Sequence, residues 1–354
     1  MKRIVLVTVI LVSVGLTSGC VRKSNSLTRN SIEADKRVPR ITLASSRELS
    51  KGDEIVSITL KDNGNLFSVQ HTKSAIVHFG FTPGGELRVN GRFEPAENWL
   101  LGDIVFTGST VGFAIGDYGT VLKTENGGLS WYKVPKFTNY DLNRVAFLNE
   151  SIGYVAGYER RINQKTDALE TKIEIWRTDD GGRSWKRCYK SDKENEVFRM
   201  VALTPDIALA LIAGQRLIRT TDGGKSWKDV FVAGRLGDFT FSANGTGWLI
   251  GDGVNLLKSE DSGETWKKVG GFPAKLQGYH WSGISMGETG NGLAVSQDGI
   301  FAYSLDYGNT WEAYPKEFKW PPFQVWVYRD VGVILDSISV YKVDFGMSSD
   351  SKGN

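Results

Sequence analysis

Apolar and polar residues alternate in short runs along most of the chain, and these runs recur as larger units. Residues 106–124, 203–220 and 241–259 show the plan most clearly: an apolar strand, a turn, a Gly/Ala-rich strand, a second turn and an alternating strand. Alternation with a period of two residues favours β-strands, and short gaps that contain glycine favour hairpins. The pattern therefore predicts a series of antiparallel meanders rather than helices.

An octapeptide ends the third strand of five of these units, at residues 124–131, 178–185, 220–227, 259–266 and 304–311. Each fits Ser/Thr-x-Asp-x-Gly-x-Ser/Thr-Trp, except that Asn126 replaces the aspartate in the first. Successive tryptophans lie 54, 42, 39 and 45 residues apart, which is the length of one four-stranded blade. We therefore expect the octapeptide between the third and fourth strands of each blade.

The chemistry of the octapeptide is structural. Its Asp side chain accepts hydrogen bonds from amides of its own turn, and its glycine supplies a positive φ. Its Ser/Thr hydroxyls tie the hairpin together, and its Trp packs a large apolar face. The residues expected in these roles are Asn126, Trp131, Asp180, Trp185, Asp222, Trp227, Asp261, Trp266, Asp306 and Trp311.

This octapeptide resembles the Asp-box, or BNR repeat, of sialidases and related propellers. The runs Leu142–Phe147, Gly153–Gly157 and Arg177–Trp185 together resemble the photosystem II stability and assembly factor-like group of BNR propellers, over residues 99–314. The resemblance implies an all-β propeller. Because members of the group include exported lipoproteins that act as assembly or scaffold factors, it also implies such a role here. No cofactor is expected.

The two ends of the chain complete the predicted ring. Residues 54–90 contain four further strand-like runs, with TPGGEL as a degenerate octapeptide, and residues 323–345 contain three. The missing fourth strand can come from Val38–Ala44, which would close the ring by pairing the chain's ends and remove its exposed edges. The count is then seven blades, with six blades or an open arrangement as the alternative.

The first residues have the pattern of an export signal. Lys2 and Arg3 precede an apolar stretch, and Leu-Thr-Ser-Gly-Cys ends at Cys20, which resembles a bacterial lipobox. We expect a signal peptide at 1–19, a flexible tether at 20–37 from a lipidated Cys20, one propeller domain at 38–346 and a disordered tail at 347–354. The protein would then face the periplasm or exterior from the bacterial cell membrane or outer membrane.

The composition of the chain limits which classes of partner and ligand are expected. The chain has 43 basic and 40 acidic side chains, so removal of Lys2 and Arg3 leaves a net charge of +1 and no field that favours nucleic acid. The three histidines lack metal-ligand spacing, so no metal is expected. Lipidation of Cys20 would leave Cys188 as the last thiol, and we expect it to be packed after an outer strand.

Catalysis has weak support in the sequence. By the resemblance, sialidase activity would need an arginine triad, an acidic proton shuttle and a Tyr–Glu pair. The nearest match to the first arginine strand, Val38–Ile41, has the wrong order. We expect a non-catalytic protein-binding scaffold. The alternatives are a glycan-binding or sialidase-like glycoside hydrolase propeller and a periplasm-facing immunity or inhibitor lipoprotein.

The partner is expected on the face opposite the octapeptides, where loops vary most. The insertion 158–172, whose DALETK end is predicted to form a helical turn, and the link 314–323 lie there. Basic and aromatic residues on this face would hold an acidic protein segment. The residues expected to bind it are Tyr118, Arg144, Arg160, Arg161, Arg199, Arg235, Trp281, Lys319 and Trp320.

Overall fold

The fold comes from a computed structural model, and all residues it describes belong to one compact unit, Arg37–Asn354. The predicted signal peptide, Cys20, the tether and the tail lie outside the described residues. The structure describes residues 39–45, 55–61, 65–70, 75–83, 86–95, 97, 100–162, 167, 169–192, 194, 196–232, 234–252, 255–269, 273–314, 318, 321–336 and 339–346.

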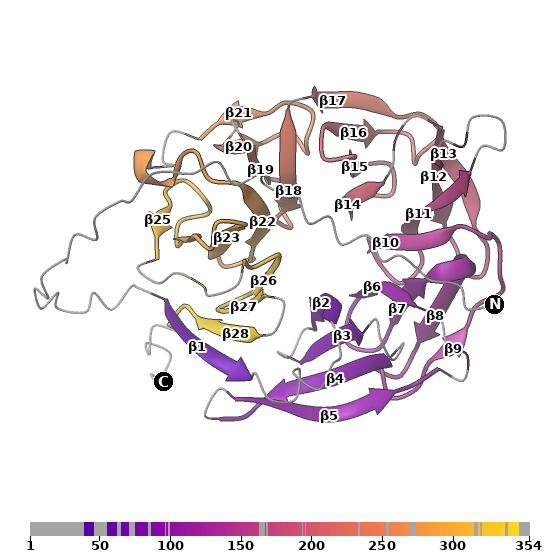
Figure 1. Cartoon of the computed structure of the whole chain (residues 1–354), viewed down its shortest axis with the longest axis horizontal. Helices are drawn as coiled ribbons and strands as arrows, with labels where there is room; N and C mark the ends of the chain where they lie inside the picture. The colour runs from indigo at the N-terminus through magenta and orange to yellow at the C-terminus, as the bar shows by residue number, and fades with distance from the viewer. Residues whose placement is uncertain are drawn as a thin grey trace, which may run out of the picture. The chain divides into compact units, whose positions relative to one another are not determined.

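Seven four-stranded antiparallel sheets surround a common axis, which confirms the predicted seven-bladed propeller (Figure 1). We number the blades 1 to 7 along the chain. Blades 1 to 3 are β2 (Ile55–Leu60), β3 (Leu66–Gln70), β4 (Ala75–Phe81) and β5 (Leu87–Phe93); β6 (Leu101–Phe106), β7 (Gly112–Gly116), β8 (Thr120–Thr124) and β9 (Tyr132–Lys133); and β10 (Asp141–Phe147), β11 (Gly153–Ile162), β12 (Leu169–Thr178) and β13 (Lys186–Ser191).

The remaining blades repeat this plan. In blades 4 to 6, the first strand along the chain is the innermost strand of the blade (Figure 1). Two short 3-10 turns, η1 (Asp117–Gly119) and η2 (Ala274–Leu276), lie in connections. Blades 4 to 7 are β14 (Val197–Ala202), β15 (Ala208–Ile212), β16 (Arg216–Thr220) and β17 (Lys228–Val232); β18 (Arg235–Phe241), β19 (Gly247–Asp252), β20 (Asn255–Ser259) and β21 (Lys267–Lys268); β22 (Trp281–Met286), β23 (Gly292–Ser296), β24 (Phe301–Ser304) and β25 (Glu312–Ala313); and β26 (Gln324–Tyr328), β27 (Val331–Leu335), β28 (Val340–Asp344) and β1 (Arg40–Ser45).

The ring closes as the sequence predicts, by pairing of a strand from each end of the chain. β1 is the outermost strand of blade 7 and pairs with β28, with Arg40 opposite Asp344 and Leu43 opposite Tyr341. Blade 7 has only three strands from the C-terminal part of the chain, so the N-terminal strand covers an edge that would otherwise be open. Each blade is therefore held by a neighbour on both sides.

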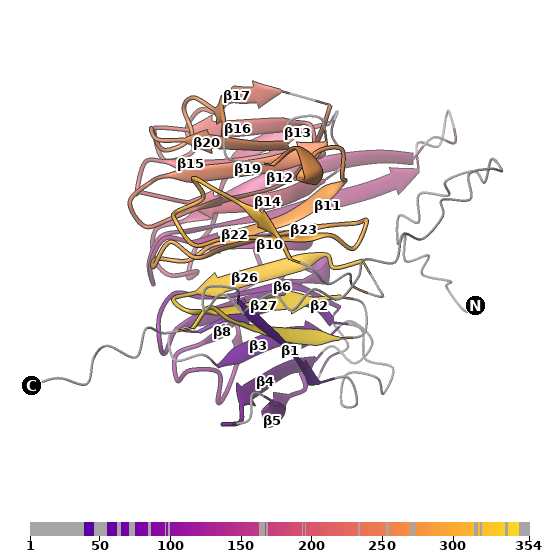
Figure 2. The same ribbon diagram turned by 90° about the vertical axis from the view of Figure 1, so that its left-hand side faces the viewer.

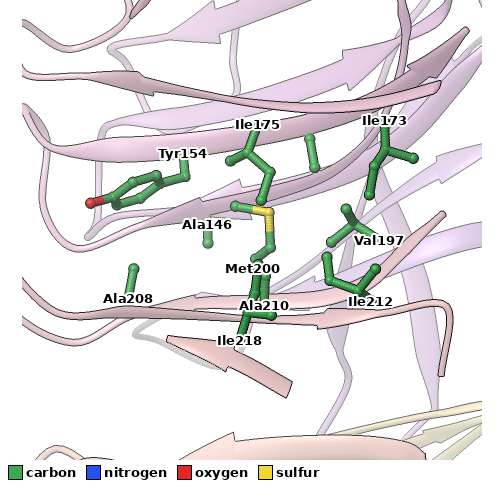
Figure 3. Packing of buried hydrophobic residues seen from close by; sticks show 11 residues of the cluster. Ala146, Tyr154, Ile173, Ile175, Val197, Met200, Ala208, Ala210, Ile212 and Ile218 are labelled. Atoms are coloured by element: carbon green, nitrogen blue, oxygen red, sulfur yellow. The ribbon is translucent and has the colours of Figure 1, made fainter. Parts of the chain in front are cut away.

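Apolar clusters between neighbouring blades form the core. The second strands are buried on both faces because each blade packs between two others; β7, β15 and β23 are buried along their whole length. Figure 3 shows the cluster between blades 3 and 4, where Tyr154 and Ile175 meet Met200 and Ile212. The Gly/Ala-rich second strands of the sequence thus fit the closely packed centre of each sheet.

The octapeptides form nearly identical turns between the third and fourth strands. In blade 4, the Thr220 hydroxyl accepts from the Gly224 amide at 2.8 Å and donates to Asp222 at 2.8 Å. Asp222 also accepts from the amide of Ser226 at 2.9 Å and from its hydroxyl at 2.6 Å. Gly224 has φ of 86°, a conformation that side chains with a Cβ resist. Each turn therefore satisfies its own polar groups.

Asn126 keeps the geometry of the first turn, but in one side-chain hydrogen bond the donor and the acceptor exchange roles. Its Oδ1 accepts from the Ser130 amide at 3.0 Å, as the aspartates do. Its Nδ2 donates to the Ser130 hydroxyl at 2.8 Å, whereas in the other turns the hydroxyl donates. The substitution of Asn for Asp thus preserves the turn without its charge.

The aspartate turns predict an acid-sensitive contribution to stability. Hydrogen bonds from the hydroxyl and amide of Ser226 lower the pKa of Asp222 to about 2. A carboxyl with a depressed folded-state pKa stabilises the fold fully above its ordinary pKa of about 4, and loses this effect as pH falls towards 2. We expect Asp222→Asn to reduce the loss of stability between pH 5 and pH 2, measured as urea midpoints. Asn126→Asp is the complementary variant and should increase that loss; equal acid sensitivity in all three proteins would contradict the assignment.

Basic residues that precede several octapeptides join each blade to the next turn. Arg219 donates to the Ser262 carbonyl at 3.0 Å, and Lys258 donates to Asn309 at 3.0 Å. In blade 3, Arg177 reaches the Pro205 carbonyl at 2.7 Å. These contacts form an outer set of inter-blade bonds on the face that carries the octapeptides.

Two local predictions were wrong. The DALETK segment forms no helical turn in its described part: residues from Leu169 onwards belong to β12, because cross-strand pairing with β11 continues to Ile162. Cys188 lies inside β13 rather than after an outer strand. Its thiol donates to the Ile175 carbonyl at 3.4 Å, and burial raises its pKa to about 12, so it is packed as expected.

Candidate functional site

An axial cavity of about 500 Å³ opens between the innermost strands of the propeller. Both polar and apolar side chains form its wall, because successive blades contribute different side chains at equivalent positions. Arginine, carboxylate and aromatic groups all face it. The polar and aromatic residues among those that line it include Ser57, Asp103, Arg144, Glu196, Phe198, Arg199, Asp238, Phe323, Gln324 and Trp326.

Polar contacts run from blade to blade around this cavity and form a closed ring. Most of the donors and acceptors lie at or next to a bulge, where the innermost strand shifts register with its neighbour. Such bulges re-aim side chains. The seven contacts join Ser57 to Asp103, Asp103 to the Val145 amide, Arg144 to the Phe198 carbonyl, Arg199 to Asp238, Asp238 to the Ile284 amide, Ser285 to the Val327 amide, and Gln324 to the Ile58 amide.

Arg199 crosses the cavity. Its Nε lies 3.6 Å from Asp238 of blade 5, and its guanidinium lies 5.0 Å from the ring centre of Trp326 in blade 7. Cation–π contact of this kind is favourable where water is partly excluded. Arg199 therefore presents a planar cation stacked on an indole inside the cavity.

Asp238 is held beneath this arginine. It accepts from the Phe239 amide at 2.8 Å and the Ile284 amide at 3.1 Å. Burial raises its pKa, and the nearby charge of Arg199 only partly offsets that rise. The wall of the cavity thus depends on Arg199 and Asp238 together.

Arg144 is tied to the backbone. It donates through Nε to the Phe198 carbonyl and through a terminal nitrogen to the Asn143 carbonyl. A guanidinium has five N–H groups, so further donors remain beyond these two bonds. Arg144 and Arg199, both predicted to bind a partner, are the two predicted residues that the structure brings together.

Tyr118 stands in the turn between the second and third strands of blade 2, opposite the octapeptides. It is 65% exposed and has φ of 54°. Its amide donates to Asp141 at 2.9 Å. Burial, together with the charge of Asp141, raises the pKa of the neighbouring Asp117 to about 6. An exposed aromatic ring and two carboxyl groups therefore lie together on this face.

The other predicted binding residues are dispersed. Arg160 and Arg161 are exposed on β11, and Arg235 is exposed at the start of β18, where it lies 3.6 Å from Asp252. Trp281 was wrongly expected at the surface: it is 2% exposed and donates to a backbone carbonyl, because it packs in the cluster between blades 5 and 6. Lys319 and Trp320 lie outside the described residues.

Sequence reasoning missed the carboxylates of the ring and its indole. Asp103 and Asp238 each follow a Leu-Gly pair at the same position of an innermost strand. This repeated Leu-Gly-Asp was a readable signal, since glycine next to a charged residue inside a strand indicates a bulge. Trp326 had no such signal, because blade 7 lacks the octapeptide that aligns the other blades.

The site differs from the arrangement that a sialidase would require. Two arginines, rather than three, face the described cavity. Tyrosine–glutamate pairs occur at Tyr140–Glu174 (3.4 Å) and Tyr303–Glu312 (2.7 Å), but none of these four residues lines the cavity.

The described residues offer neither a cluster of potential metal ligands nor a helix that could cross a membrane. They contain no group of three or more His, Cys, Asp or Glu side chains placed to hold a metal ion. Within the same residues, no helix has the length and apolar character needed to cross a membrane.

The fold and the site define a closed seven-bladed β-propeller with a charged and aromatic axial cavity. No protein-family model and no curated protein matches the sequence. Similar solved structures include YCF48 bound to D1 peptide, which is 16% identical with a TM-score of 0.63 over 87% of this chain and 97% of that one. Catalytically inactive virginiamycin B lyase from Staphylococcus aureus with quinupristin is 14% identical with a TM-score of 0.59, over 87% and 99%. The RRP9 WD40 repeats are 10% identical with a TM-score of 0.60, over 86% and 97%. At these identities the similarity establishes the fold.

Proposed function

We propose that this protein is an exported, membrane-anchored scaffold or assembly factor that binds a protein partner without catalysis. The observation that carries the proposal is the axial cavity, where Arg199 stacks on Trp326 within a ring of inter-blade bonds. A rigid ring can hold such groups in place before a partner arrives, which lowers the ordering cost of binding. Similar propellers include one solved with a bound peptide, YCF48 with D1 peptide, and this likeness supports the choice of a protein partner.

The partner is an acidic segment that approaches the face opposite the octapeptides. Arg199 and Arg144 offer donors in the cavity, and Tyr118 offers an exposed ring on that face. Carboxylates form their strongest hydrogen bonds with guanidinium groups, and tyrosine is frequent among residues that dominate binding energy. Anchoring through a lipid on Cys20 would hold this cavity near membrane-associated partners.

The test uses residues outside the ring of inter-blade bonds, because alanine at Arg144 or Arg199 would also disturb the fold. We expect Tyr118→Asn combined with Arg235→Glu to reduce partner recovery at least tenfold, in affinity purification from washed, detergent-solubilised membranes. Asn tolerates the positive φ of position 118. Leu129→Ser is the matched control, since Leu129 is 83% exposed in an octapeptide turn on the other face. Equal recovery by all three proteins would contradict the binding face, and absence of the chain from the membranes would contradict the anchor.

A further inference from the structure

Blade 3 carries a two-stranded ribbon that extends past its own sheet (Figure 2). β11 and β12 pair in continuous register as far as Ile162 opposite Leu169. β10 stops pairing with β11 at Tyr158, and β13 stops pairing with β12 at Ile173. Residues 159–162 and 169–172 therefore pair only with each other among the described strands. We call them the ribbon, and each of its strands has one open edge.

One face of the ribbon, which we call the apolar face, carries the exposed side chains of Ile162 and Leu169 beside Arg160 and Thr171. Side chains alternate between the two faces of a strand, so Arg160 and Ile162 continue the face of Tyr158. Within the four-stranded part of blade 3, that face packs into the core cluster between blades 3 and 4. Ile162 and Leu169 are directly opposite each other and are 67% and 65% exposed. The apolar face of blade 3 thus continues into solvent with no described cover.

The opposite face of the ribbon is charged and self-neutralising. Glu159 and Arg161 on β11 stand opposite Lys172 and Glu170 on β12. Arg161 and Glu159 are 2.6 Å apart. Two acidic and two basic side chains give this face no net charge, which is typical of a surface in contact with water.

Arg160 is the single charged residue on the apolar face. Its guanidinium lies 4.5 Å from the ring centre of Tyr158. No described carboxylate lies within ion-pair distance of it, whereas Arg161 is paired on the other face. The apolar face therefore has one uncompensated positive charge between Tyr158 and Ile162, and a carboxylate flanked by apolar groups would complement it.

We propose that the open edge of residues 159–162 is a strand-addition site for an extended segment of a partner protein. The added strand would carry an acidic residue opposite Arg160 and an apolar residue opposite Ile162, and it would stop short of Tyr158, which already pairs with Asp141 of β10. Main-chain bonds to an open sheet edge supply affinity, and alternate side chains supply specificity. The proposal rests on the function proposed above and assigns the partner's conformation and side-chain pattern.

The choice of edge follows from the order of strands in blade 3. β11 lies between β12 and the innermost strand β10, so its open edge faces the propeller axis. A segment bound there would continue from the ribbon towards the mouth of the axial cavity. The open edge of β12 faces the outside of the ring and has no such continuity.

The test uses the purified full chain in detergent and a fluorescein-labelled peptide with the core Val-Thr-Glu-Thr-Val. Its Val and Glu side chains share one face of a strand, and a Val-Thr-Lys-Thr-Val peptide is the charge control. We expect Arg160→Glu to weaken binding at least tenfold, measured by fluorescence anisotropy. Arg161→Glu, which makes the same change one residue away on the other face, should alter binding less than twofold. Hydrogen exchange should show peptide-dependent protection at residues 159–162.

Three results would overturn the inference: no saturable binding of the acidic peptide, equal effects of the two arginine variants, or no peptide-dependent protection at residues 159–162. Dimerisation that is lost in Ile162→Asp, seen by sedimentation, would identify a second copy as the occupant and also overturn it. Normal partner recovery by Arg160→Glu, with loss in the Tyr118/Arg235 variant, would reject the ribbon and keep the proposed function. Binding of the acidic peptide at the ribbon without recovery of any partner from membranes would keep the strand-addition site and reject the proposed function.

Discussion

Replacing Gly237 by alanine is expected to destabilise the propeller by about 3 kcal/mol or more, the upper range for an overpacked core. A Cβ at this position would lie 2.0 Å from the Trp281 carbonyl oxygen of the next blade. The obstacle is backbone, which cannot rotate away as a side chain can. Because the ring is closed by pairing of β1 with β28, blades 5 and 6 cannot separate without straining the other interfaces.

Two other glycines make this a graded test. Gly102 occupies the equivalent position in blade 2, but its Cβ would lie 3.0 Å from the Leu142 carbonyl oxygen. Gly91 has no atom within 4 Å of the added carbon, and its alanine variant should change stability by less than about 0.5 kcal/mol. Urea unfolding followed by tryptophan fluorescence should rank the alanine variants Gly91, Gly102, Gly237 in rising order of destabilisation. Any other order would contradict the close approach of the innermost strands.

Asp238→Ala is expected to lower the free energy of unfolding by about 3–5 kcal/mol, as when one partner of a buried ion pair is removed. The change leaves the guanidinium of Arg199 without its nearest carboxylate and leaves the Phe239 and Ile284 amides without acceptors. Asp238→Asn should cost less, because its amide oxygen can still accept a hydrogen bond. Burial raises the pKa of Asp238, which means that the site does not favour the charge itself.

A surface pair with the same separation provides the control. Arg235 and Asp252 are also 3.6 Å apart, but the Arg235 side chain is 51% exposed. Exposed ion pairs contribute at most about 1 kcal/mol, so Asp252→Ala should have a small effect in the same urea experiment. Similar losses in the two alanine variants would show that the ring around the cavity contributes no more than surface charges do.

The turns were predictable from sequence because their interactions are local. In each octapeptide, the Ser/Thr, the Asp or Asn and the glycine bond to each other within a few residues. The fourth strand of blade 7 was also predictable, because three strands near the C-terminus require a partner and Val38–Ala44 is the free candidate. The structure confirms that partner, with β1 at Arg40–Ser45.

The two arginines of the cavity show where prediction from sequence ended. Arg144 and Arg199 hold equivalent positions, each just past a bulge in an innermost strand. Arg144 turns to a backbone carbonyl of the next blade, whereas Arg199 reaches Trp326 on a blade three places further along. The two arginines differ in their contacts because different side chains lie across the axis from them, and those side chains are remote in sequence. Trp281 is a similar case, since packing between blades 5 and 6 buries a residue that sequence placed on the surface.

The sequence by itself determined the repeat and the position of the octapeptides, and it predicted seven blades and a closed ring, with six blades or an open arrangement as the alternative. It could do so because the turns form within eight residues and the spacing of the tryptophans matches one blade. Only the tertiary structure decided what lines the axial cavity and which strand edges stay open. Those features join residues from different blades, such as Ile58 and Gln324, 266 positions apart, and such residues meet only when the ring has closed.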